Sequence, residues 1–278
     1  MAQVTKKYEK LFIYLILFIF LVCALFPVYW MFNTSIKNNS EIYSLKPTFW
    51  PETFSLKSYE NLFKNTKFPT YLMNSFVVSM TATVFSMIFS ILTAYAIARL
   101  KFRGNLVISR IILYVYLIPS SVLYIPLYLF VASMGFLDKS MGLLITYPTF
   151  VIPYATWMLI SYFKTIPASL EDAATVDGCT YFQTILKVII PVATPGIMSV
   201  FIFSFTQCWG EYLYALVIVT SDIKKTIPIG LSEMIVDDFF NWGPLMAGAV
   251  VSTVPIIIMY MLSSKYLVTG MTAGSVKQ

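Results

Sequence analysis

The residue types and spacings that point most clearly to a function lie in one polar segment, 166–191, with the sequence IPASLEDAATVDGCTYFQTILKVIIP. Glu171 and Asp172 stand where a helix would begin, and the helix dipole favours acids in a first turn. Ala173 and Ala174 are strong helix formers and leave a small surface for close approach. The segment offers no nucleophile–base pair, and so regular a polar unit in an apolar chain indicates a docking surface rather than a catalytic centre.

The same segment predicts a helix, a turn and a second helix. Pro167 suits a first helical position, where a missing N–H costs nothing. Asp177-Gly178 is a turn pair, because glycine adopts positive φ readily. Thr180 and Gln183 have the spacing of a capping box for the second helix. That helix carries an apolar stripe at helical spacing, made of Phe182, Ile185, Leu186 and Ile189.

Residues for catalysis or metal binding are scarce elsewhere. The chain has no His, and Cys23, Cys179 and Cys208 are isolated, which supports neither a metal site nor a disulfide framework. No G-x-x-x-x-G-K-[ST] phosphate loop occurs. We therefore expect no catalytic residue, no metal and no cofactor in this chain.

The composition is that of a polytopic membrane protein. The chain is 58% hydrophobic and only 12% charged, whereas soluble domains carry about 25% charged residues. A soluble apolar domain is the alternative, and such a core cannot hide this much apolar surface. Lys6, Lys7 and Lys10 precede a run from Leu11 to Trp30 that is too long for a cleaved signal peptide. We interpret that run as a first spanning helix.

Six stretches reach the ~20 apolar residues that a helix needs to span a bilayer. The predicted fold is therefore all-α, a single transmembrane unit over 1–278. It has a polar outer loop at 34–70, a five-helix core at 71–268 that contains an inner loop at 164–190, and a tail at 269–278. The spans are Leu11–Asn33, Tyr71–Ala98, Leu106–Ser133, Met141–Phe163, Val192–Thr220 and Pro244–Val268. Any single proline within a span indicates an ordinary kink, whereas so many together favour broken helices that line a path. These prolines are Pro119, Pro126, Pro148, Pro153, Pro195 and Pro255.

Orientation follows from the basic residues. The densest cluster runs from Arg99 to Arg110, and basic residues favour the cytoplasmic side. This places the N-terminus, the C-terminus and the loop at 164–190 inside, and the loop at 34–70 outside. The net charge of +6 is then an orientation signal rather than a nucleic-acid signal.

The polar segment resembles the EAA loop of importer permeases of the ATP-binding cassette (ABC) class. The triplet is Asp172-Ala173-Ala174, Gly178 follows after three residues, and the closing motif ends in Ile190-Pro191. Further stretches are similar to the smaller membrane subunit of maltose-type carbohydrate importers. They are Ala98–Gly104, Ile125–Tyr128 and Gly270–Lys277.

The resemblance implies a type I ABC importer transmembrane domain in a bacterial cytoplasmic membrane. A partner ATPase would bind ATP and Mg and dock on the loop. The implied assembly also has a second homologous permease subunit, a second ATPase subunit and an extracytoplasmic solute-binding protein that delivers a sugar or oligosaccharide. The implied coupling residues are Glu171, Asp172, Ala173, Ala174, Asp177, Gly178 and Pro191, and the implied ATPase-contacting tail residues are Gly270, Thr272, Gly274 and Lys277.

A solute path is expected near the fifth span. Glu211 is the one acid that these boundaries place within a span, and an ionisable group at that depth is a functional candidate. Structural, gating and binding-protein roles for Glu211 remain open beside direct solute contact. Aromatic residues that could stack on sugar rings are also candidates, although Tyr and Trp populate interfacial belts too. The candidates are Trp209, Tyr212, Tyr124 and Tyr154.

Four alternatives stand beside this interpretation. The polar segment could be a helix pair lying on the membrane surface. The chain could be a permease of the same class for glycerol phosphate or a polyamine. An ion-coupled carrier is disfavoured by the lack of intramembrane charge, and a membrane-embedded enzyme by the lack of a nucleophile–base pair.

Overall fold

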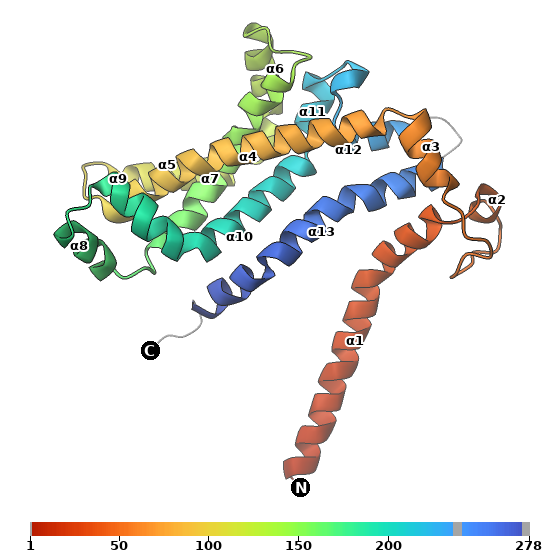
Figure 1. The fold of residues 1–278 in the computed structure, drawn as a ribbon, viewed down its shortest axis with the longest axis horizontal. Coiled ribbons are helices and arrows are strands. Elements are labelled where there is room, and N and C mark those ends of the chain that lie inside the picture. Colours follow the sequence, from red (N-terminus) through yellow and green to blue (C-terminus); the bar gives the residue numbers. More distant parts are fainter. Residues whose placement is uncertain (1, 236–240, 274–278) are drawn as a thin grey trace. The chain divides into compact units, whose positions relative to one another are not determined.

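The computed structural model describes residues 2–235 and 241–273, and their side chains over 9–235 and 241–263. Over these residues the regular elements are helices and no strand occurs, which confirms the all-helical prediction. The chain forms two compact units (Figure 1). One comprises Met1–Pro69 and Leu231–Val254, and the other comprises Thr70–Gly230 and Pro255–Gln278.

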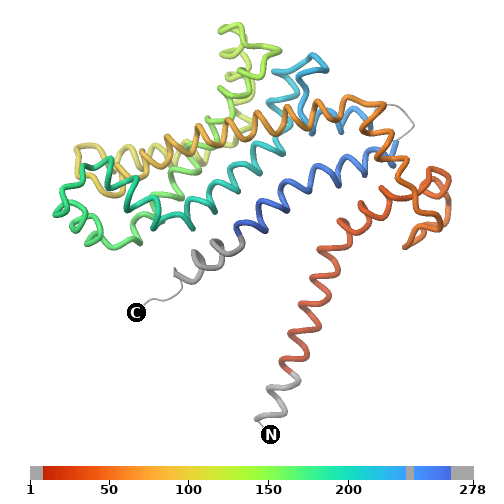
Figure 2. Tube along the Cα trace, in the orientation of Figure 1, coloured from red at the N-terminus to blue at the C-terminus, as the bar shows by residue number. Residues whose placement is uncertain are grey.

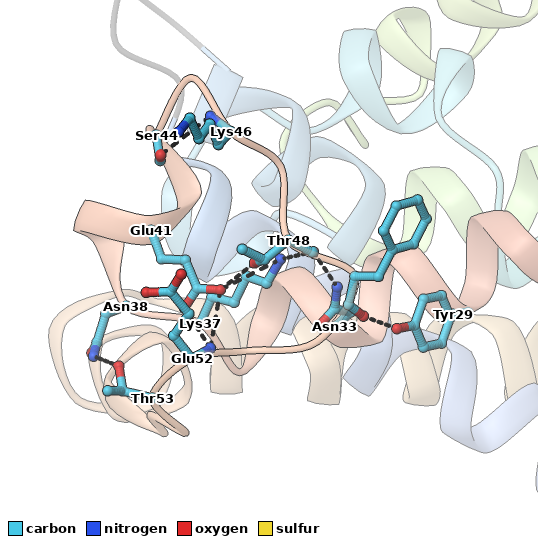
Figure 3. Close-up of polar contacts among 11 residues, drawn as sticks. Tyr29, Asn33, Lys37, Asn38, Glu41, Ser44, Lys46, Thr48, Glu52 and Thr53 are labelled. Carbon is cyan, nitrogen blue, oxygen red and sulfur yellow. Dashed lines mark hydrogen bonds and ion pairs between the residues drawn. The ribbon is translucent and has the colours of Figure 1, made fainter.

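The first unit contains a long apolar helix and a folded polar loop. Its elements are α1 (Ala2–Ser35), α2 (Asn39–Ile42), α3 (Lys57–Asn65), η4 (Glu233–Ile235) and the start of α13 (Trp242–Ala273). Lys37 is almost fully buried, lies over the Trp30 ring at 5.2 Å and donates to the carbonyl of Thr48. The Thr48 hydroxyl in turn donates to Glu41, and Figure 3 shows these contacts converging on one loop. Buried polar groups need such partners, so this loop has a fixed structure of its own.

The second unit is a bundle that carries different structures at its two ends. In Figure 1, α4, α7 and α10 run side by side, with α8 and α9 at one end and α6 and α11 at the other. Its elements are α4 (Phe68–Arg99), α5 (Asn105–Leu117), η1 (Ser120–Leu123), α6 (Tyr124–Ser133), α7 (Ser140–Phe163), α8 (Ser169–Val176), α9 (Tyr181–Thr184), η2 (Ile185–Ile189), α10 (Ile190–Trp209), α11 (Leu213–Ile218), η3 (Asp222–Lys224), α12 (Ile227–Ser232) and the part of α13 from Pro255 onward. Phe68, Pro69 and the end of α12 are assigned to the first unit.

Five helices of the described chain are long and apolar enough to cross a membrane, and a bent pair raises the number to six. The five are Glu9–Ser35, Phe68–Arg99, Ser140–Phe163, Tyr181–Trp209 and Trp242–Ser263. The bent pair is Asn105–Leu117 with Ser120–Ser133. These segments agree with the six-span architecture expected from hydropathy.

The bent pair changes direction by 87° at Ile118–Pro119, a turn that Figure 2 traces. Proline lacks an N–H and restricts the residue before it, so a helix ends there readily. Other prolines predicted to break spans do not do so, because α7 runs through Pro148 and Pro153 and α10 runs through Pro195. Among the described spans, the helix pair at Pro119 is the one that is sharply bent.

A carboxylate joins two loops at the end of the bundle that carries α6 and α11. Asp138 has a positive φ of 54°, a conformation that Asp tolerates better than most residues. One oxygen accepts the N–H groups of Thr220 (3.0 Å) and Ser221 (2.8 Å), and the other accepts the Ser221 hydroxyl. Hydrogen bonds from Ser221 hold the pKa of Asp138 well below its usual range, with further help from Thr220 and Lys224. The charged form therefore fixes the α6–α7 loop to the segment after α11.

The two ends of the bundle have separate apolar cores. One core gathers Tyr95, Phe163, Ile166 and Ile189 with their neighbours. The other gathers residues of α6, α7 and α11, among them Val131, Tyr147 and Ile218. At the rim of the first core α7 and α10 approach closely, since a Cβ on Gly196 would lie only 2.5 Å from Cγ of Tyr162.

This contact makes a packing prediction. In Gly196→Ala the new methyl group meets Cγ, Cδ1 and Cδ2 of Tyr162 at 2.5–2.6 Å, so the ring cannot avoid it by moving only its tip. We expect a loss of about 1–3 kcal/mol, measured as a lower apparent midpoint of thermal unfolding in detergent. Gly210→Ala is the control, since its nearest contact is an ordinary 3.5 Å. Equal midpoints for the two variants would contradict this close packing.

Candidate functional site

The helix α8 is the first part of the predicted docking segment, and it presents one free face. It begins at Ser169 after Ala168, so the prediction that Pro167 opens the helix is wrong. Residues 164–166 continue tight turns from the end of α7 and delay the start. Asp172 and Ala173 are exposed and Val176 is 87% exposed, whereas Ala174 is buried. Of the two alanines, only Ala173 is therefore open to a partner.

The turn after α8 has a left-handed backbone that favours glycine. Gly178 has φ +79°, and its N–H donates to the carbonyl of Thr175 at 3.0 Å. The next N–H, of Cys179, donates to the carbonyl of Ala174 at 2.9 Å. This pair of bonds closes the end of a helix around a left-handed residue. A Cβ on Gly178 would meet nothing within 4 Å, so the need for glycine is conformational and not steric.

The second predicted helix exists and runs directly into a span. Thr180 and Gln183 form the capping box: the Thr180 N–H donates to Gln183 Oε1 at 2.9 Å, and the Gln183 N–H donates to Thr180 Oγ1 at 3.4 Å. The helix then continues through η2 into α10, with Pro191 in the first turn of α10. The predicted stripe divides, because Ile185 and Ile189 are buried while Phe182 and Leu186 are exposed.

An ion pair fastens α8 to the end of α4. Nε of Arg99 lies 2.6 Å from Oε1 of Glu171, and both side chains are largely buried, with 13% and 17% exposure. Arg99 also donates through Nη2 to the carbonyl of Ile166 at 2.6 Å. The hydroxyl of Tyr95, one turn earlier on α4, donates to Oε2 of Glu171 at 3.2 Å. Both carboxylate oxygens of Glu171 are therefore held by α4.

This partnership was missed by sequence reasoning, which used Arg99 only as an orientation signal. The two partners are 72 residues apart, and no local pattern relates them. The only available signal is the i, i+4 spacing of Tyr95 and Arg99, which places both on one face at the end of α4. Sequence reasoning assigned Glu171 to the docking surface, but its carboxylate points toward α4. The acids that remain exposed on this segment are Asp172 and Asp177.

Two of the predicted solute-path residues meet at a cavity of 410 Å³ in the second unit. Tyr124 and Glu211 line it, whereas Tyr212, Tyr154 and Trp209 do not. Trp209 is buried and stacks on Phe205, and Tyr154 is buried against Phe203 at 4.5 Å.

Glu211 lies beyond the end of α10, so the prediction that it sits within a span is wrong. Hydropathy did not detect the break at Gly210, which ends the helix. The two oxygens of Glu211 accept the N–H groups of Tyr214 (2.8 Å) and Ala215 (3.1 Å), so Glu211 caps α11.

The tail prediction is only partly covered by the structure. Gly270 and Thr272 fall within the bounds of α13, whereas Gly274 and Lys277 lie outside the described residues.

The chain resembles proteins of known class over its full length. Residues 86–273 match the family described as binding-protein-dependent transport system inner membrane component. The chain is 37% identical to the inner membrane ABC transporter permease protein YcjP of Escherichia coli, covering 100% of both chains. It is 34% identical to the sulfoquinovosyl glycerol transport system permease protein SmoH of Agrobacterium fabrum, covering 93% of this chain and 91% of that one.

A solved structure agrees with these relatives. A chain of a bacterial ABC transporter involved in the import of the acidic polysaccharide alginate superposes with a TM-score of 0.83 at 27% identity, covering 95% of this chain and 98% of that one. This match confirms the predicted importer-type transmembrane architecture. The chain belongs to the family of inner membrane components of binding-protein-dependent transport systems.

Proposed function

We propose that this chain is the permease subunit of an ATP-driven importer for a sugar or oligosaccharide. A binding protein delivers the solute outside the cell, and a separate ATPase supplies the energy at α8. The two reported relatives with a named cargo, for sulfoquinovosyl glycerol and for alginate, both handle carbohydrates by their descriptions. Within the described residues no group of three metal-ligating side chains gathers. In this proposal ATP and Mg are bound by the partner ATPase.

One observation carries the proposal: α8 is exposed on one face and fixed on the other. Asp172, Ala173 and Val176 are open to a partner, while Glu171 is held by Arg99. A partner that moves α8 must therefore move the end of α4 with it. The turn at Gly178 and the capping box at Thr180 pass the same motion into α10. A helix pair that only rested on a membrane surface would have no need of this attachment.

The complete assembly follows from the same proposal. It contains a second homologous permease subunit and two ATPase subunits. The loop at 164–190 and both termini lie on the cytoplasmic side, where the tail residues Gly270, Thr272, Gly274 and Lys277 contact the ATPases. The docking set on the loop is Glu171, Asp172, Ala173, Ala174, Asp177, Gly178 and Pro191, in which Glu171 and Ala174 act from the inner face.

The ion pair makes a charge-reversal prediction. Arg99→Glu leaves two carboxylates facing each other beside Ile166, and losing a largely buried ion-pair partner costs several kcal/mol. We expect sugar uptake per ATP hydrolysed to fall about ten-fold or more, measured with the full transporter reconstituted in vesicles. Adding Glu171→Arg restores the opposite charges and should recover part of the uptake.

Arg103→Ala is the control, because Arg103 is an exposed basic residue of the loop that follows α4. Its uptake should remain normal. Normal coupling in Arg99→Glu, or no recovery in the double variant, would contradict the role of the pair.

The turn at Gly178 makes a conformational prediction. Gly178→Val places a β-branched residue at φ +79°, whereas Gly178→Asn introduces a residue that tolerates this conformation. We expect the valine variant to assemble with its partners and to lose ATP-dependent uptake, and the asparagine variant to keep most of it. The assay uses labelled sugars with glycerol phosphate and a polyamine for comparison.

Gly104→Val supplies the control for strain alone, because Gly104 has φ +92° in a loop that does not belong to α8. Full uptake by Gly178→Val would show that the turn does not transmit motion. Uptake of glycerol phosphate or the polyamine in place of sugar would reject the proposed solute class.

A further inference from the structure

A cavity beside the α5–η1 break is lined by aromatic and polar side chains, some of which keep exposed surface. It lies where α5 ends and η1 begins, against α7 and the junction of α10 with α11, all within the second unit. Its 410 Å³ is within the range of small-molecule sites, about 300–1,000 Å³. Its lining residues are Val115, Tyr116, Leu117, Ile118, Pro119, Ser120, Ser121, Leu123, Tyr124, Thr149, Phe150, Pro153, Gln207, Glu211, Leu213 and Tyr214.

One wall of the cavity is a continuous aromatic surface. The Tyr214 ring lies 5.9 Å from Tyr124 and 6.1 Å from Phe150, nearly parallel to Phe150 at 12°. The Tyr214 hydroxyl donates to the carbonyl of Ser120 at 2.7 Å, which fixes this ring to the helix break. Tyr124 and Phe150 are only half-buried, so both keep accessible ring area. Flat apolar surfaces of this kind suit the C–H faces of a sugar ring.

Two polar side chains of the lining are available for a ligand. Gln207 lines the cavity from α10, and among the described residues its amide makes no hydrogen bond. An amide both donates and accepts, which matches a sugar hydroxyl. The hydroxyl of Ser121, at the break, is likewise without a hydrogen bond within the described chain.

The charge of the lining selects among solutes. Of the lining residues in the described chain none is Lys or Arg, so a phosphate, sulfonate or uronate would enter without a compensating charge. Glu211 is the acid of the lining, and both its oxygens are taken by the N–H groups of Tyr214 and Ala215. These N–H groups are neutral and leave the carboxylate charge in place, so the lining disfavours anionic solutes. Burying an uncompensated charge is costly.

We propose that this cavity is a binding site for one or two rings of a neutral saccharide during its passage through this subunit. The rings pack on Tyr124 and Phe150, which the buried Tyr214 ring supports from behind, and Gln207 and Ser121 bind hydroxyl groups. Glu211 is a positioning residue that holds α11 and, through it, Tyr214. The proposal rests on the proposed import function and narrows its solute to an uncharged sugar.

The first test places a photoreactive p-benzoyl-phenylalanine at Tyr124. The reconstituted transporter, with its binding protein and ATPases, is irradiated during turnover with radiolabelled neutral mono- and disaccharides, and with glucuronate for comparison. We expect a cross-link to a neutral sugar from position 124. The same residue placed at Tyr114, an exposed tyrosine of α5 outside the lining, should give none.

The second test uses Gln207→Leu, which removes the amide and keeps the volume. We expect uptake of the neutral sugar per ATP hydrolysed to fall about ten-fold, as expected when one polar contact to a sugar is lost, while Tyr114→Leu leaves it unchanged.

Neutral-sugar uptake without a cross-link at 124 and without an effect of Gln207→Leu would overturn the site and leave the import function standing. Preferential uptake of glucuronate would overturn the neutral assignment. Absence of uptake for every sugar would reject the import function and this site together.

Discussion

The ion pair between Arg99 and Glu171 is the contact on which the rest of the second unit depends. It is largely buried, and Tyr95 and the carbonyl of Ile166 complete it. Breaking such a pair costs several kcal/mol because the remaining charge keeps its burial and loses its partner. The pair therefore holds α8 and the end of α4 as one piece, although the chain between them passes through α5, η1, α6 and α7.

A second connection leaves the same loop through the backbone. From Thr180 onward α9, η2 and α10 form one helical segment, and Gln207 stands near its far end, at the cavity. A push on α8 thus reaches the cavity end along α10 and also along α4. The close contact of Gly196 with Tyr162 joins α10 to α7, whose Thr149 and Phe150 line the same cavity. The docking loop and the cavity therefore lie at opposite ends of the same packed helices.

The local features of this protein were predictable, and the distant ones were not. The capping box at Thr180 and the glycine turn at Gly178 follow from residues within a few positions of each other. Six apolar spans follow from length and hydropathy. By contrast, Arg99 meets Glu171 only after the bundle has packed. Hydropathy did not show that α10 ends before Gly210, and Glu211 therefore caps α11 instead of lying within a span. Hydropathy also did not distinguish Pro119, where the helix breaks, from the prolines that stay inside helices, which are Pro148, Pro153 and Pro195.

The central claim is that α8 and the end of α4 move as one piece during the transport cycle. The most direct measurement is the distance between spin labels at Val176, which is 87% exposed, and Lys101, which is exposed just after α4, once Cys23, Cys179 and Cys208 have been replaced by serine. Pulsed electron paramagnetic resonance on the assembled transporter, nucleotide-free and ATP-bound, should give the same distance distribution in both states. A clear shift of that distribution on binding ATP would contradict the account.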